Sequence, residues 1–148
     1  MKTSEVMDRV KLLCPSFATI AHALTSAADP APYPAALVTP SRTTAASNPF
    51  LGQTVVANGG VWSQEVTQIF SVFIIQERRQ DTATSSAADD LDTLTNELRA
   101  ALVGWTGGSS FAAPMQYAGG ALSEFRPGIA AWREDFSIET EMRVAPHV

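Results

Sequence analysis

The longest β-strand pattern in the chain, VWSQEVTQIFSVFIIQE at residues 61–77, places the strongest limit on the folds it can adopt. Its even-numbered positions are mostly apolar, and Ile69, Phe73 and Ile75 add a second apolar face. Strands with two apolar faces are typical of the interior of a sheet, because both sides must be removed from water. We therefore expect a long central strand that is covered on both sides.

A helix is predicted at residues 4–14, because Thr3 and Ser4 can cap its start and Pro15 ends it. Its apolar residues recur at three- and four-residue spacing and form one stripe. They are Val6, Met7, Val10, Leu13 and Cys14. Cys14 is the only cysteine, which rules out a disulfide within the chain. Its place on the stripe favours a small buried hydrophobe over a reactive thiol.

A longer helix is predicted to begin after a cap at Ser85 or Ser86, with Asp89 and Asp90 in its first turn. Its apolar stripe is Ala87, Leu91, Leu94, Leu98, Leu102 and Trp105. The following GWTGGSS, residues 104–110, has the glycines of a phosphate-binding loop. Such loops precede a helix and carry a lysine, whereas this segment follows a helix and has none. We interpret it as the corner that leads from the helix into a strand.

Shorter patterns predict further strands before the central one. Residues 16–24 fit either a strand or a helical turn, and AALVTP at 35–40 predicts a strand that ends at its proline. Residues 41–52 predict a loop, since turn-forming residues cluster there. QTVVA at 53–57 and the following Asn-Gly-Gly at 58–60 predict a hairpin into the long strand.

Two strands are predicted at residues 115–125 and 129–144. Gly119 and Gly120 indicate a bend or a close backbone approach in the first. The second alternates polar and apolar residues, which predicts one exposed acidic face. We interpret its carboxylates as solvated rather than catalytic, since general acids need burial. They are Glu134, Asp135, Glu139 and Glu141. The predicted fold class is α+β, a mostly antiparallel sheet with two main helices on one side, in a single domain spanning 1–148.

Charge and residue usage exclude several kinds of function. The net charge of −5 and an isoelectric point near 4.9 argue against a nucleic-acid-binding face. His22 and His147 have no second ligand at zinc-binding spacing, and no catalytic set is apparent. We therefore predict no catalytic residue, no metal and no cofactor. The longest apolar run, residues 69–75, is too short to cross a bilayer. The sequence also shows no secretory signal. We therefore expect the protein to be made and assembled in the cytoplasm.

Several motifs occur in one order along nearly the whole chain. They are the first helix ending at Pro15, YPAALVTP, VTQIFSVFIIQERRQD running into AADDLDTLTNELRAALVGW, P-x-x-Y-x-G-G-x-L at 114–122 and W-x-x-D-F at 132–136. This ordered set resembles the tail terminator proteins of long-tailed bacteriophages, particularly temperate phages of the Pseudomonas type.

The resemblance implies a structural virion protein at the head-proximal end of the tail. Six copies would form a ring that caps the tail tube, stops its polymerisation and docks the head connector. The implied partners are further copies of the chain, the tail tube protein and the connector or stopper protein, while DNA passes through the lumen without specific binding and no membrane is involved.

The segment from Ser41 to Trp62 is predicted to be an assembly element that becomes ordered in the ring. Its hydroxyl-rich first half has little to pack within one chain. Apolar contacts to a neighbour are expected from Phe50, Leu51 and Trp62. Polar contacts are expected from Arg42, Arg78 and Arg79 to acidic residues such as Glu139 and Glu141 of that neighbour. The alternative is a mobile hairpin with Trp62 in its own core.

Other functions remain open at this point. The chain could be another head–tail joining, stopper or minor tail protein. It could also belong to a different class, a small cytoplasmic enzyme or ligand-binding domain with a pocket beneath residues 41–52.

Overall fold

The computed structural model describes residues 1–24, 32–46, 62–77, 84–108, 112–126 and 128–144. These residues form two helices and five strands. In chain order they are α1 (Thr3–Leu13), β1 (Thr19–His22), β2 (Ala35–Ala45), β3 (Trp62–Glu77), α2 (Thr84–Leu102), β4 (Gln116–Arg126) and β5 (Ile129–Val144). The predicted α+β class is confirmed. The hairpin predicted at 53–60 lies outside the described residues.

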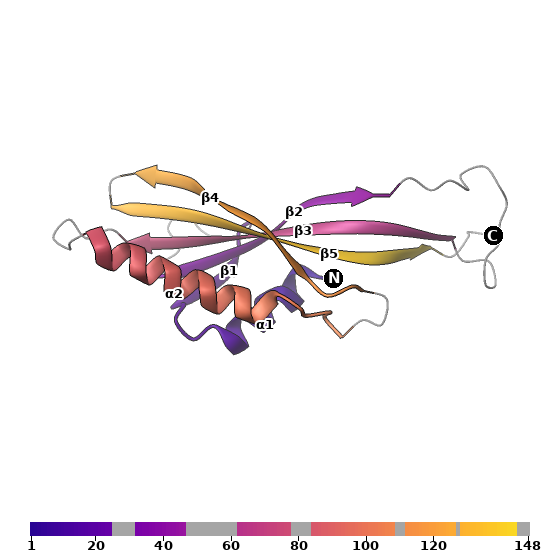
Figure 1. Cartoon of the computed structure of the whole chain (residues 1–148), viewed down its shortest axis with the longest axis horizontal. Helices are drawn as coiled ribbons and strands as arrows, with labels where there is room; N and C mark the ends of the chain where they lie inside the picture. Colours follow the sequence, from indigo (N-terminus) through magenta and orange to yellow (C-terminus); the bar gives the residue numbers. More distant parts are fainter. Residues whose placement is uncertain (25–31, 47–61, 78–83, 109–111, 127, 145–148) are drawn as a thin grey trace.

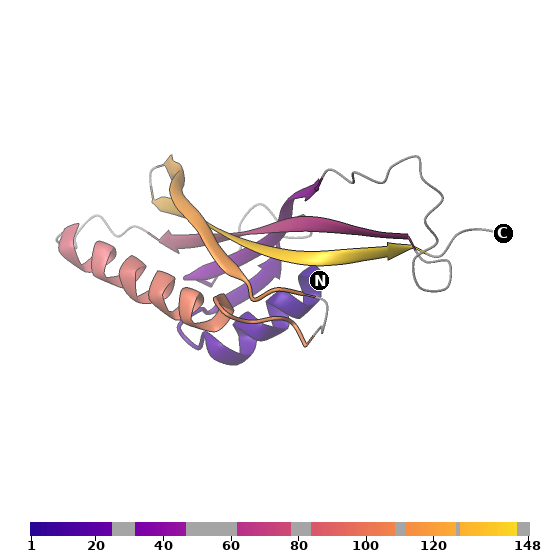
Figure 2. The same cartoon turned by 45° about the vertical axis from the view of Figure 1, so that its right-hand side comes forward.

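The strands form one sheet in the order β1-β2-β3-β5-β4. Its β1 strand runs parallel to β2, and every other neighbouring pair is antiparallel. The central position predicted for β3 is confirmed, since it pairs with β5 from Trp62 to Glu77 and with β2 on its other side. Both helices lie on the same face of the sheet (Figures 1 and 2).

The sequence predicts that β2 ends at Pro40 and that a loop follows. This prediction is wrong for residues 41–45, which belong to the strand. The strand continues through a register shift between Pro40 and Arg42 and pairs with β3 as far as Ala45. Pro40 is tolerated because of its position at an edge. Val38 accepts the last hydrogen bond from the β1 side, from the Ala23 N–H at 2.9 Å. Two residues further, the nitrogen of Pro40 faces that same side, where no described strand needs its missing N–H.

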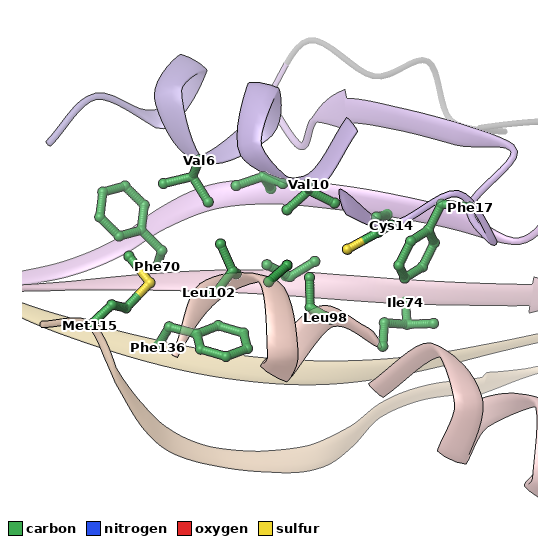
Figure 3. Packing of buried hydrophobic residues seen from close by; sticks show 14 of the residues in the cluster. Val6, Val10, Cys14, Phe17, Phe70, Ile74, Leu98, Leu102, Met115 and Phe136 are labelled. Carbon is green, nitrogen blue, oxygen red and sulfur yellow. The ribbon is translucent and has the colours of Figure 1, made fainter. Parts of the chain in front are cut away.

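The hydrophobic core lies between the sheet and its two helices (Figure 3). Leu94, Leu98 and Leu102 of the predicted α2 stripe are buried, while Leu91 and Trp105 pack against the core at its margin. Figure 3 shows α1 placing its own side chains on the same core. They include Val6 and Val10, and Cys14 follows directly after the helix; all three are exposed by 1% or less.

The prediction that β3 is covered on both sides is wrong in part. Helices cover the face that carries Phe70, Val72 and Ile74, which are fully buried. The opposite face of β3 carries Ile69 and Phe73, which are only half-buried, and no described helix lies over it. Apolar residues on both faces of β3 therefore indicated its central position in the sheet correctly, but they did not indicate that helices cover both faces.

The ends of both helices differ from the predicted caps. Lys2 occupies the cap position of α1, and its N–H donates to the Glu5 carboxylate at 2.6 Å. The second helix begins at Thr84, so Ser85 and Ser86 lie inside it and its first turn holds no acidic residue. Serine and threonine occur both inside helices and at their caps, so the sequence alone fixes such boundaries only to within a residue or two. Leu13 of the predicted α1 stripe is 39% exposed.

The strands β3 and β5 continue beyond the helices as a two-stranded arm, which we define as residues 62–65 and 141–144 (Figures 1 and 2). The alternation of β5 predicts that Met142 faces the core. It does lie on the helix side, but it is 45% exposed because neither helix extends this far. Neither helix therefore covers the arm.

Candidate assembly surfaces and the buried Glu134 cluster

The described residues contain no arrangement typical of a metal centre. No three side chains of the His, Cys, Asp and Glu types gather there closely enough to hold an ion. His22 is half-buried at the end of β1, where its Nδ1 accepts a hydrogen bond from the Leu24 N–H at 3.1 Å. Among all the described residues, neither helix has the length and apolar character needed to cross a membrane.

The buried thiol of Cys14 lies between α1 and α2. It contacts the main-chain oxygen of Glu97 at 3.7 Å and is 1% exposed. Burial, and to a lesser degree the Glu97 carboxylate, raise the pKa of this thiol to about 11. The thiol therefore stays protonated near neutral pH, and the interpretation of Cys14 as a buried hydrophobe is confirmed.

The most distinctive polar feature is Glu134, which is fully buried on the helix face of β5. The interpretation of this carboxylate as solvated is wrong. Strand alternation itself carried the correct signal, because Glu134 has the same parity as the buried Phe136 and Ile138. Arg99 of α2 donates to it from Nε at 2.9 Å and from Nη2 at 2.8 Å.

Two aromatic side chains complete what we call the Glu134 cluster: Arg99, Tyr117, Trp132 and Glu134. The indole N–H of Trp132 donates to the carboxylate at 2.6 Å, and the Tyr117 hydroxyl does so at 3.4 Å. Arg99 also donates to the Tyr117 oxygen at 3.1 Å and lies over its ring. The buried carboxylate is thus paired and hydrogen-bonded, as a charge removed from water requires.

The charges of the cluster shift the pKa values of its outer members. Burial, followed by the Glu134 carboxylate, raises the pKa of Tyr117, so its hydroxyl keeps its proton. The hydrogen bond to Glu134 raises the pKa of Arg99, which stays positively charged. The Glu134 carboxylate has no exposed surface, and the cluster connects α2 to β4 and β5.

Gly119 and Gly120 fit β4 around this cluster, which confirms the predicted bend and close approach. Gly119 has a φ of 128° beside a register shift in the β4–β5 pairing. At Gly120 the constraint is space. A β-carbon there would lie 2.8 Å from a Glu134 carboxylate oxygen and 2.9 Å from the Tyr117 hydroxyl.

Replacing Gly120 with alanine is therefore expected to lower the free energy of unfolding by about 1–3 kcal/mol, the usual cost of overpacking. Thermal and denaturant unfolding followed by circular dichroism would measure it. Ala121→Ser, at an exposed site on the same strand, is the matched control and should change stability by about 0.5 kcal/mol or less. Equal stability of the two variants would show that Gly120 is not constrained by the cluster.

The glycine-rich segment after α2 is a structural corner, as predicted. The Gly104 N–H donates to the Met115 carbonyl at 2.8 Å, and the Met115 N–H donates to the Trp105 carbonyl at 2.9 Å. Arg9 of α1 lies over the Trp105 ring at 5.4 Å. These contacts join the end of α2 to the start of β4 and to α1.

The structure places three of the predicted assembly residues on one face of the sheet, opposite the helices. Arg42 lies opposite Ile69 of β3, and Glu139 lies opposite Thr67. Both are exposed, and neither forms an ion pair with another described residue. Glu141 is already paired with Arg143 at 2.9 Å, and that hydrogen bond lowers the pKa of Glu141.

The other predicted assembly residues lie at the tip of the arm or outside the described residues. Trp62 begins β3, where its backbone pairs with Val144 at the tip of the arm. Phe50, Leu51, Arg78 and Arg79 lie outside the described residues. Of the proposed assembly segment, Ser41–Ala45 is part of β2 in the single chain and needs no neighbour to become ordered.

Comparison with known proteins connects these features to a family. No curated protein matches the sequence. The family model described as "Phage tail terminator protein" matches residues 1–146. The match includes both helices and all five described strands, together with the Glu134 cluster formed by residues of the recognised motifs. The chain therefore belongs to the phage tail terminator protein family.

Proposed function

We propose that this protein forms a six-membered ring that caps the head-proximal end of the tail tube of a long-tailed phage. The ring stops tube polymerisation and offers its other surface to the head connector or stopper. Membership of the tail terminator family, whose proteins are structural components of the virion tail, is the observation that carries this proposal. The sheet edges and the exposed arm are compatible surfaces for assembly.

In the proposed ring, Arg42 of one subunit contacts Glu139 of the next. The two side chains are exposed on the same sheet face and have no ionic partner in the described part of their own chain. Arg78 and Arg79 are further proposed polar contacts to acidic residues including Glu141, and Phe50, Leu51 and Trp62 are the proposed apolar ones. DNA passes through the lumen without specific binding.

Deletion of the gene is expected to produce tails that are overlong and lack heads, because nothing ends tube growth or joins the connector. Electron microscopy of lysates would measure tail lengths and head attachment, with the wild-type gene supplied in trans as the control. Headless tails of normal length would favour the alternative of a stopper or joining protein. Normal tails attached to heads would contradict both functions.

Charge reversal tests the proposed Arg42–Glu139 contact. Arg42→Glu is expected to weaken ring formation by about tenfold, the scale of 1.4 kcal/mol for a lost charge pair. The double variant Arg42→Glu/Glu139→Arg should recover much of this loss. Analytical ultracentrifugation would report assembly. Equal losses in the single and double variants would show that the two residues do not meet.

A further inference from the structure

The strand β4 leaves an open edge on the sheet. It is last in the strand order and pairs only with β5 in the described part of the chain. Residues 116–123 are exposed at all positions but Gly119, and they contain no charged residue and no proline. Edge strands that must stay single usually carry such residues to prevent pairing with another chain. Residues 116–123 of β4 lack this protection, and the charged residues of the strand, Glu124 and Arg126, lie at its end.

Two exposed apolar side chains lie along the same edge. Tyr117 is 41% exposed and Leu122 is 59% exposed. Their register opposite Phe136 and Trp132 places both on the helix side of β4. A strand added beside β4 would satisfy its free backbone groups and cover these side chains, which is how a β-augmentation interface gains affinity.

The Glu134 cluster holds this edge in position before any partner binds. The Tyr117 hydroxyl is bonded to both Arg99 and Glu134, and Gly120 packs directly against the cluster. A strand whose position is fixed in the free subunit loses little conformational entropy on pairing, so more of the contact energy remains for binding.

A second open edge lies on the other side of the sheet. The pairing of β1 with β2 ends at Val38, and residues 41–45 of β2 pair only with β3 among the described strands. This segment, Ser-Arg-Thr-Thr-Ala, is mostly exposed, and its two threonines favour extended structure. Among the described strands, two different edges are therefore left without a partner strand.

We propose that β4 of one copy pairs with residues 41–45 of β2 in a neighbouring copy, so that the sheets of adjacent subunits become continuous. This inference rests on the proposed ring and names the surfaces that build it. Because the two edges differ and lie on opposite sides of the sheet, the contact is head-to-tail, the kind that forms a ring when the rotation between subunits closes. It also brings Arg42 within two strand spacings, roughly 10 Å, of β5 in the neighbour. The outer-face residues Gly119 and Ala121, which would lie between them, are small, and the β5 residues opposite them are Asp135 and Arg133.

Cross-linking between two variants that each carry one added cysteine tests this contact. Ala121→Cys and Thr44→Cys place thiols on the outer face of the two edges. The native Cys14 does not interfere, because it is buried. A short bis-maleimide should produce covalent dimers when the two purified variants are mixed under conditions in which wild-type rings form. Neither variant alone should cross-link, and Leu12→Cys mixed with Ala121→Cys is the negative control.

A charge at the edge gives an independent measurement. Leu122→Lys is expected to raise the dissociation constant of the ring by about tenfold or more, while the melting temperature of the subunit stays unchanged. Leu12→Lys is the control, since Leu12 is also an exposed leucine, at 75%, but lies on the helical layer.

The outcomes separate this inference from the proposed function. Wild-type rings without the mixed cross-link, together with normal assembly of Leu122→Lys, would overturn the edge pairing and leave the ring intact. Cross-linking of Ala121→Cys to itself or to the tail tube protein in place of Thr44→Cys would also overturn it. Wild-type protein that stays monomeric both alone and with tail tubes would contradict the ring and the edge pairing together.

Discussion

Replacing Leu98 with alanine is expected to lower the free energy of unfolding by about 2–5 kcal/mol, the range for truncating a fully buried leucine. Leu98 has no exposed surface and projects from the last third of α2 into the core (Figure 3). Val10 of α1 and Phe136 of β5 belong to the same buried cluster. The missing methyl groups would leave a cavity between elements that come from distant parts of the chain. Denaturant unfolding of the purified subunit would measure the loss.

The control for Leu98 is Leu12→Ala in α1. Leu12 is 75% exposed, and alanine has at least the helix propensity of leucine, so its stability should change by about 0.5 kcal/mol or less. If both variants unfold at the same denaturant concentration, the placement of α2 over the sheet is wrong. A loss confined to the assembled ring would instead mean that Leu98 packs against a neighbouring subunit.

Replacing Arg99 with methionine is expected to cost about 3 kcal/mol, at the lower end for breaking a buried ion pair. Methionine keeps the length of the side chain but removes both donors to Glu134. The carboxylate would then remain buried with only Trp132 and the longer contact from Tyr117. The lower end applies because the Arg99 side chain is 37% exposed, so water can replace part of what is lost.

A double-mutant cycle separates the ion pair from packing. Arg99→Met/Glu134→Leu removes both charges, and we expect it to be more stable than Arg99→Met alone, because no unpaired carboxylate stays buried. The double variant should lose less stability than the two single variants lose when their losses are added, and this difference is the coupling free energy. Purely additive losses would show that Arg99 and Glu134 do not act as a pair.

The α2 stripe and the β3 strand could be predicted because they depend on local periodicity. Apolar residues at three- and four-residue steps must form one face of a helix wherever it packs, and Leu94, Leu98 and Leu102 are buried as expected. The corner after α2 was also predictable, since its glycines follow a helix. Positive φ at Gly104 agrees with that interpretation.

The continuation of β2 past Pro40 could not be predicted from the residues around it. Proline normally interrupts a strand, and the exception depends on which side of β2 its nitrogen faces. That side is decided by where β1 ends, which is a property of the sheet. For the same reason, the exposure of Met142 depends on the length of the helical layer and not on the alternation of β5.

The sequence by itself determined the elements, the order of the motifs and the absence of any evident catalytic pattern, because these depend on residues that are near neighbours along the chain. The tertiary structure alone decided that Glu134 is buried and paired with Arg99, whose position lies 35 residues away. It also decided which strands form the edges of the sheet. Pairing across such separations depends on how α2, β4 and β5 are arranged in space, and short-range patterns carry no information about that arrangement.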